Sequence, residues 1–417
     1  MLRIVNRCAT GVRALHTSSA ALAAAQQQQV VILSHARTPI GAFNGALASL
    51  TAPQLGTHAV KEALKRAGVQ GGDVNEVILG NVVSSGLGQA PATQVSLRAG
   101  LPSSTPTTSV NKVCASGMKT VMFGAQSIAL GQNAVVVAGG FESMSNTPYY
   151  LPRVRQGLGL GHGVVEDGII KDGLWDAHDN HHMGNAAEVC AKQFGFTRKQ
   201  QDDFALETFR RAQEAQAAGK FAAEIAPVTL TIKGVETVVS EDEGPRKLRK
   251  DKVPTLKPAF AKEGTVTAAN SSSLNDGAAA IVLASAEYAQ SKGLKPLARI
   301  LGYADAQQLP VEFTTAPAKA IPLALARAGI SLEQVDAFEI NEAFAVVALA
   351  NQKLLGLDSS KLNVNGGAVA LGHPIGASGA RIIGTLVEVL RQNKGKYGVA
   401  SICNGGGGAS AIVVELL

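Results

Sequence analysis

Two cysteines and a histidine supply the residue types needed for thiol-based acyl transfer. Cys114 lies in Asn-Lys-Val-Cys-Ala-Ser-Gly, and Cys403 lies 289 residues later in Ile-Cys-Asn-Gly-Gly-Gly-Gly. His373 lies between Gly372 and Pro374 in a run of small residues. A thiolate attacks carbonyl carbon, a histidine can take the proton of the thiol, and glycines let a substrate approach the backbone. These residues therefore predict an acyl-transfer site.

Each of these residues also has an ordinary structural interpretation, since a lone cysteine is commonly a buried core residue. Cys114 precedes an expected helix, whose N–H groups and dipole should favour the thiolate. Gly405, close to Cys403, could present its backbone N–H to an oxyanion. Asn341 follows an expected strand at 335–340, where it could cap a turn or orient a water or a substrate carbonyl. Occurring together, these features favour the catalytic interpretation.

The segments that must position these residues occur twice in the chain. Ala-Leu-Lys-Arg-Ala-Gly at 63–68 reappears as Ala-Leu-Ala-Arg-Ala-Gly at 324–329. In both copies we expect a helix to end at the capping glycine and a strand to follow. Cys-Ala-Ser-Gly-Met-Lys at 114–119 likewise parallels Gly-Ala-Ser-Gly-Ala-Arg at 376–381. A helical spacing of apolar residues, then a short strand ending in glycines, follows each copy of the second motif. Because Gly376 stands where the first copy has cysteine, the fold itself needs no thiol there.

Strands that alternate with helices predict an α/β fold with parallel sheets covered on both faces. The duplication predicts two related halves, at about 30–145 and 291–417, packed around a pseudo-twofold axis. A stretch at about 146–270 breaks the pattern and is rich in glycine, histidine, proline and charge. We expect it to be a loop domain inserted into an N-terminal domain that spans 30–290.

The expected insertion contains two further groups of polar residues. Five of the seven residues at 246–252 are basic, which suits a phosphate-bearing ligand but is also typical of a solvated face. His178, His181 and His182 could bind a metal, although they lack a cysteine partner or a helical His-x-x-x-His spacing. On their own they indicate a metal site only weakly.

Composition and charge narrow the function classes. The 417 residues are 46% hydrophobic and 17% charged, which indicates a folded protein, and no apolar stretch approaches the ~18 residues of a membrane span. The net charge is +6, but the basic residues are not interleaved with aromatics, so we expect no nucleic-acid partner. Residues 1–29 contain arginine and serine but no acidic residue. They predict a mitochondrial presequence and a matrix location, the alternative being a tail without an address.

Six motifs, taken in their order along the chain, resemble those of the thiolase family from about residue 30 onward. They are Asn111–Gly117, Gly139–Met144, Asn270–Gly277, Asn341–Phe344, Gly372–Pro374 and Cys403–Gly407. The resemblance implies duplicated αβαβα layers with an inserted loop domain. It also implies reversible condensation of two acetyl-CoA to acetoacetyl-CoA and CoA in a homotetramer, with coenzyme A thioesters as substrates and no required cofactor.

The same resemblance implies a ping-pong mechanism. Cys114 would hold the acetyl group as a thioester with His373 as its base, and Cys403 would take the α-proton of the second acetyl-CoA. Asn341, through a water, and His373 would stabilise the enolate oxygen. The N–H groups of Cys114 and Gly405 would hold the thioester oxygen.

Binding residues follow from the resemblance in the same way. The implied coenzyme A contacts are His182, Met183, Lys247, Lys252, Ser272 and Phe344. Met183 is typical of the short-chain branch, where it narrows the acyl pocket. Potassium-activated relatives have a tyrosine where this chain has Phe209, although the backbone positions of the same site remain, at Ala268, Ala269, Ser271 and Val369. Since a hard cation prefers oxygen ligands, we expect weak or absent potassium activation.

Three other functions remain open at this stage. A degradative 3-ketoacyl-CoA thiolase of β-oxidation would use the same chemistry on longer acyl chains. A ketoacyl synthase shares the architecture but would pair one cysteine with further histidine or asparagine. An inactive thiolase-like protein that binds CoA or lipid is opposed by the intact Cys114, His373 and Cys403.

Overall fold

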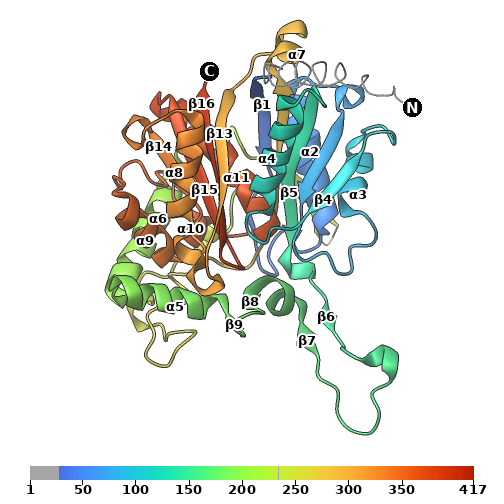
Figure 1. Ribbon diagram of the computed structural model, residues 1–417. Coiled ribbons are helices and arrows are strands. Elements are labelled where there is room, and N and C mark those ends of the chain that lie inside the picture. The colour runs from blue at the N-terminus through green and yellow to red at the C-terminus, as the bar shows by residue number, and fades with distance from the viewer. Residues whose placement is uncertain (1–27, 233) are drawn as a thin grey trace, which may run out of the picture.

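The computed structural model describes residues 28–232 and 234–417, so the predicted presequence lies outside this part of the chain except for its last two residues. The described residues form one ten-stranded mixed sheet with helices on both sides, and three small hairpins (Figure 1). Across these two ranges, no helix combines the length and the apolar character needed to cross a membrane.

The order of the strands repeats the duplication seen in the sequence. The first half has β1 (Val30–Arg37), β3 (Glu76–Gly80), β4 (Thr107–Val110), β5 (Val135–Ser143) and β12 (Asn275–Ser285), with the short β2 (Gly41–Ala42) beside β12. The second half has β13 (Ala298–Gln307), β14 (Ala337–Ile340), β15 (Tyr397–Asn404) and β16 (Gly408–Leu416). The spatial order β1-β12-β5-β3 of the first half recurs as β13-β16-β15-β14 in the second.

The expectation of parallel sheets is wrong for most of the strand pairs. β3 is parallel to β4 and β5, and β14 is parallel to β15. However, β12 is antiparallel to β1 and β5, and β16 is antiparallel to β13 and β15. The physical reason is clearest after Cys403, where a turn of glycines leads directly into β16. A connection this short joins only antiparallel neighbours, because a parallel pair needs a long crossover.

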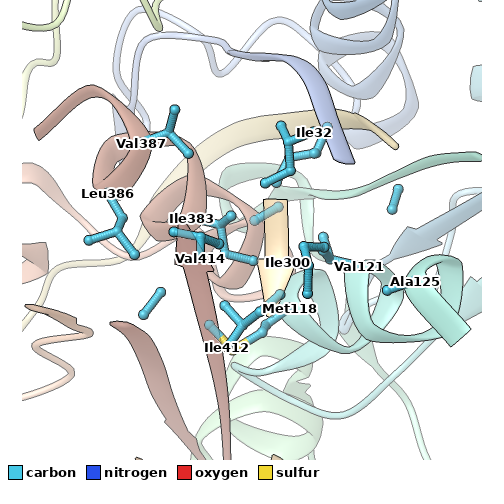
Figure 2. Packing of buried hydrophobic residues seen from close by; sticks show 14 of the residues in the cluster. Ile32, Met118, Val121, Ala125, Ile300, Ile383, Leu386, Val387, Ile412 and Val414 are labelled. Carbon is cyan, nitrogen blue, oxygen red and sulfur yellow. The ribbon is translucent and has the colours of Figure 1, made fainter. Parts of the chain in front are cut away.

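Two helices lie between the halves and share their core. α4 (Ser116–Ala129) and α11 (Ile375–Asn393) pack on strands of both halves, and Figure 2 shows their apolar side chains meeting those of the strands. Every residue of α11 at 375–390 is buried, as expected for a helix that is covered on all sides. α2 (Ala52–Ala67) and α3 (Pro91–Ala99) cover the outer face of the first half, and α8 (Pro317–Ala328) covers that of the second. The α–β–α–β–α order agrees with the predicted fold class.

Small residues allow the two central helices to approach closely. A Cβ atom added at Gly117 of α4 would lie 2.9 Å from the carbonyl oxygen of Gly376 and from the nitrogen of Ala380 in α11. The outer helices α2 and α8 resemble each other in how they end. α2 ends at Gly68 with φ 65°, and α8 ends at Gly329 with φ 67°, the left-handed conformation predicted for both capping glycines.

The region between β5 and β12 contains helices as well as loops. Its helices are α5 (Met183–Phe194) and α6 (Arg198–Ala217), and its hairpins are β6 (Tyr149–Tyr150) with β7 (Glu166–Asp167), β8 (Trp175–Asp176) with β9 (His181–His182), and β10 (Val228–Ile232) with β11 (Val235–Val239). Cys190 is a buried residue of α5. The remaining helices are α7 (Ala286–Ser291), α9 (Ala345–Leu355) and α10 (Ala368–Leu371).

Candidate active site

Cys114 is held in a tight turn between β4 and α4. Ser116 Oγ accepts the N–H of Lys112 at 2.8 Å and donates to the carbonyl oxygen of Val113 at 2.6 Å, which closes the turn on both sides. Val113 has φ 48°, a left-handed conformation that is costly for a β-branched residue. This strained position places Cys114 before the first turn of α4, where its side chain lines a cavity.

Backbone N–H groups favour the Cys114 thiolate, in the direction expected from the sequence, but burial opposes them more strongly. Burial raises the pKa of the Cys114 thiol to about 11, although the backbone N–H groups of Gly405 and of Cys114 itself lower it. The cost of burying a charge therefore exceeds the stabilisation from the nearby N–H groups. The resting thiol is neutral at physiological pH, so it needs a base when a carbonyl arrives.

His373 has the tautomer that such a base requires. Its Nδ1 lies 2.7 Å from Ser378 Oγ, and that hydroxyl already donates its only proton to the carbonyl oxygen of Pro374 at 2.9 Å. Nδ1 must therefore carry the proton and donate it to Ser378, which leaves the lone pair on Nε2. Burial lowers the pKa of His373 to about 3, so the ring is neutral and can accept a proton.

Asn341 and His373 meet although different strands and helices position them. Asn341 follows β14 and precedes α9, and its Nδ2 lies 3.5 Å from His373 Nε2. The Asn341 side chain is 1% exposed, and its Oδ1 has no hydrogen-bond partner among the described residues. A buried amide oxygen without a protein partner fits a site for an ordered water.

Cys403 lies at the end of β15, behind the wall of the cavity. It is fully buried, and burial followed by the proximity of Cys114 raises the pKa of its thiol well above the usual value. Gly405, two residues later, lines the cavity and points its N–H at Cys114. Thus the structure brings together Cys114, His373, Cys403, Asn341 and Gly405, which come from four separate segments of the sequence.

A cavity of about 450 Å³ joins three of these five residues to four of the six implied coenzyme A contacts. Its lining includes His182, Met183, Ser272 and Phe344 as well as Cys114, His373 and Gly405. His182 caps α5 by accepting the N–H of Gly184 at 3.0 Å, and its ring stacks on Phe260 with centroids 4.7 Å apart. Met183 narrows the cavity beside the reacting groups, because its Sδ lies against Gly405.

Lys247 and Lys252 line a second, adjacent cavity of about 620 Å³. The two cavities share the wall formed by Ala268, Ser271, Ser273 and Leu274. The five positions expected at a potassium site, which are Phe209, Ala268, Ala269, Ser271 and Val369, line this second cavity as well. Phe209 contributes a ring without an oxygen ligand to this cavity, whereas Ser271 contributes a hydroxyl.

Two structural residues of the site were not singled out from the sequence. Ser378, which fixes the tautomer of His373, looks like one of several small residues in the repeated Ala-Ser-Gly motif. Glu142 is fully buried and accepts hydrogen bonds from Asn81 Nδ2, from two backbone N–H groups after β3 and from the N–H of Gly376. Burial raises its pKa to about 7. The sequence signal that could have identified Glu142 is an acidic residue near the end of an otherwise apolar strand.

The fold and the site together define an acyl-transfer enzyme class with two thiols. Residues 30–287 match the N-terminal domain of thiolases and residues 294–416 match the C-terminal domain. The chain therefore belongs to the thiolase family.

Two curated relatives and one solved structure illustrate the similarity. The chain is 56% identical to the probable acetyl-CoA acetyltransferase of Dictyostelium discoideum over 93% of this chain and 94% of that protein. It is 52% identical to the mitochondrial acetyl-CoA acetyltransferase B of Xenopus laevis, over 100% of this chain and 99% of that protein. The crystal structure of the Acat5 thiolase from Ascaris suum in complex with coenzyme A has 47% identity and a TM-score of 0.89, and the match covers 94% of this chain and 100% of that one.

Proposed function

We propose that this protein is an acetyl-CoA C-acetyltransferase, which condenses two acetyl-CoA to acetoacetyl-CoA and CoA, and reverses that reaction. The observation that carries the proposal is that Cys114 lines one cavity with a neutral His373, and that the thiol of Cys403, from the opposite half, is close enough for Cys114 to raise its pKa. The names of the relatives point to the same activity.

In the first half-reaction, Cys114 Sγ attacks the carbonyl carbon of acetyl-CoA while its proton moves to His373 Nε2. The N–H groups of Cys114 and Gly405 stabilise the oxyanion that forms. The carbon–sulfur bond to CoA then breaks and the CoA sulfur takes the proton of Cys403. This leaves acetyl-Cys114, a Cys403 thiolate, and a His373 whose Nε2 holds the proton of Cys114. Because the thiol pKa is about 11 and that of His373 about 3, proton transfer must accompany attack rather than precede it.

In the second half-reaction, Cys403 removes the α-proton of another acetyl-CoA. Asn341, through a water on its free Oδ1, and His373 stabilise the enolate oxygen. The α-carbon attacks the acetyl carbonyl, and Cys114 leaves as a thiolate that takes its proton back from His373, while Cys403 keeps the α-proton as its thiol. Because the pKa of the buried Cys403 thiol is high, its thiolate exists only while substrate is bound.

Trapping the covalent intermediate tests the proposal. Full-length protein incubated with labelled acetyl-CoA is expected to carry one acetyl group on the peptide that contains Cys114. Cys114→Ala should carry none, whereas Cys190→Ala, which changes a buried thiol of α5, should be labelled like the wild type. Unlabelled wild-type protein that still binds CoA would instead support an inactive binding protein.

We propose short acyl chains as the preferred substrates, because Met183 narrows the cavity next to Gly405. Thiolysis of a C4 3-ketoacyl-CoA should be faster than that of a C16 3-ketoacyl-CoA. Faster C16 thiolysis would favour a degradative enzyme of β-oxidation.

We also propose that potassium activates this enzyme weakly or not at all, because Phe209 lacks the oxygen of a tyrosine. Replacing sodium by potassium should change wild-type activity by less than about twofold, whereas Phe209→Tyr should gain a potassium response. A severalfold response in the wild type would contradict this proposal.

The location, assembly and domain limits are part of the same proposal. Residues 1–29 are a mitochondrial presequence for import into the matrix, in line with their composition and with the mitochondrial relative. Deleting these residues should abolish import, which cell fractionation measures.

We propose a homotetramer, testable by light scattering, with domains at 30–290 and 291–417 and an insertion at about 146–270.

A further inference from the structure

The hairpin β8–β9 places three potential metal ligands together at one end of the substrate cavity. Asp176 of β8 and His181 of β9 are directly paired across the hairpin, and Asp179 lies in its loop. One carboxylate oxygen from each aspartate and one ring nitrogen of His181 all lie within 4.8 Å of one another. Donor atoms that share a zinc ion are separated by roughly 3.4 Å, so a contraction of at most about 1.4 Å would bring them to that spacing.

In this cluster, one carboxylate oxygen of Asp176 has hydrogen-bond partners and the other has none among the described residues. Its Oδ1 accepts the backbone N–H groups of His178 and Asp179 at 2.8 and 3.2 Å, which fixes the loop. Its Oδ2 is buried without a hydrogen-bond partner among the described residues, and the residue is 5% exposed. A buried carboxylate oxygen of this kind is costly unless a cation or a hydrogen-bond donor binds it.

His181 has the tautomer of a metal ligand. Its Nδ1 lies 3.2 Å from the carbonyl oxygen of His182, and a carbonyl can only accept, so Nδ1 carries the ring proton. The lone pair is therefore on Nε2, which is also buried without a partner in the described part of the chain. Metal-binding histidines characteristically donate their other N–H to a carbonyl or carboxylate in this way.

We propose that Asp176, Asp179 and His181 bind one divalent transition-metal ion, with zinc as the preferred ion. Two carboxylates balance its charge, and an imidazole nitrogen favours zinc over magnesium or calcium, which prefer oxygen ligands. The exposed Asp179 gives the ion access from solvent, and water completes its coordination.

The ion would fix one wall of the substrate cavity without taking part in acetyl transfer. His181 precedes His182, which caps α5, stacks on Phe260 and lines the cavity with Met183. Bridging β8 to β9 would hold this segment in place. The zinc site is independent of the proposed acetyltransferase activity, and each can fail without the other.

Zinc binding to the full-length protein tests the site. Wild-type protein, freed of metal by a chelator and then dialysed against zinc chloride, is expected to retain one zinc per chain at this hairpin. Asp176→Asn keeps an oxygen for the two loop N–H groups but removes the charge, and His181→Gln removes the ring nitrogen. Each should weaken zinc binding by roughly 100-fold or more, since loss of even an outer partner of a metal site costs up to about that much.

His162→Gln is the matched control, because His162 is an exposed histidine of the same inserted region and lies outside the cluster. It should bind zinc like the wild type. Zinc binding that is equal in the wild type, Asp176→Asn and His181→Gln would overturn the proposal, because the ion would then be bound elsewhere, for example by the active-site thiols.

Cobalt provides a test that needs no variant. Cobalt bound by nitrogen and oxygen alone should give visible d–d bands without the sulfur-to-metal charge-transfer band that a thiolate ligand produces. The midpoint of thermal unfolding should also rise with zinc concentration, as for any ligand that binds only the folded state. Absence of cobalt binding, or a charge-transfer band at the first equivalent bound, would overturn the proposal.

Discussion

The N-termini of α4 and α11 occupy equivalent places in the two halves but have different roles. At α4, the strained Val113 presents Cys114 to the cavity. At α11, Gly376 donates its N–H to Glu142 at 2.9 Å, and a Cβ atom there would lie 2.7 Å from the same carboxylate. The second helix start therefore has no room for a nucleophile, because it holds the two halves together.

The residue three positions before each copy of the repeated motif at 114–119 and 376–381 also differs between the halves. In the first half it is Asn111, which accepts the N–H of Val113 and donates to the carbonyl oxygen of Val82. In the second half it is His373, which faces the cavity. Duplication thus supplied the same local fold twice. In the proposed mechanism the first half contributes the nucleophile, and the second half contributes His373 and the second thiol.

The largest expected effect separates the two cysteines. Cys403→Ala should lower the rate of acetoacetyl-CoA formation by about 10⁴-fold, since it removes the base of the second half-reaction. Labelling of Cys114 by acetyl-CoA should persist, as measured by peptide mass after a single incubation. Loss of labelling in Cys403→Ala would contradict the division of work between the halves.

Removing the contact that joins α11 to the first half should cost the most stability. Glu142→Ala leaves four hydrogen-bond donors buried without an acceptor, so we expect the free energy of unfolding to fall by about 4 kcal/mol. Chemical denaturation measures this change. Glu214→Ala, which breaks an exposed ion pair on α6, is the control and should cost less than about 1 kcal/mol. Equal effects of the two substitutions would mean that Glu142 does not join the halves.

Disturbing the tautomer of His373 should have an intermediate effect. Ser378→Ala removes the acceptor of the Nδ1 proton, so kcat should fall by about 30-fold while KM stays nearly constant. Ser34→Ala is the matched control, because Ser34 is another buried serine whose hydroxyl donates to a backbone carbonyl, that of Ala63. An unchanged kcat in Ser378→Ala would show that the serine does not position the ring.

The smallest effect concerns the charge of Cys114 at the start of α4. Because burial raises its pKa to about 11, the thiolate fraction, and with it alkylation by iodoacetamide, should rise about tenfold per pH unit between about 7 and 9. Peptide mass analysis should show the fully buried Cys403 unmodified in the same samples. A rate that is already at its plateau near pH 7 would mean that the helix N-terminus outweighs burial.

Much of this architecture was predictable because the two halves share local motifs. The glycine caps of α2 and α8 were predicted from six-residue repeats, since a left-handed cap is a local property of the chain. The antiparallel placement of β12 and β16 was not, because strand pairing depends on which distant segments meet rather than on alternation of helix and strand.

By itself, the sequence determined the residue types of the site, the duplication and the family resemblance. Only the tertiary structure decided that Ser378 fixes the His373 proton, that Glu142 links the helix starts, and that Asp176 and His181 face each other across a hairpin. It also decided that burial outweighs the N–H groups that favour the Cys114 thiolate. The physical reason is common to all four, because desolvation and hydrogen-bond geometry depend on atoms that folding brings together. Helix capping, hydrophobic periodicity and the chemistry of each residue type depend only on local sequence.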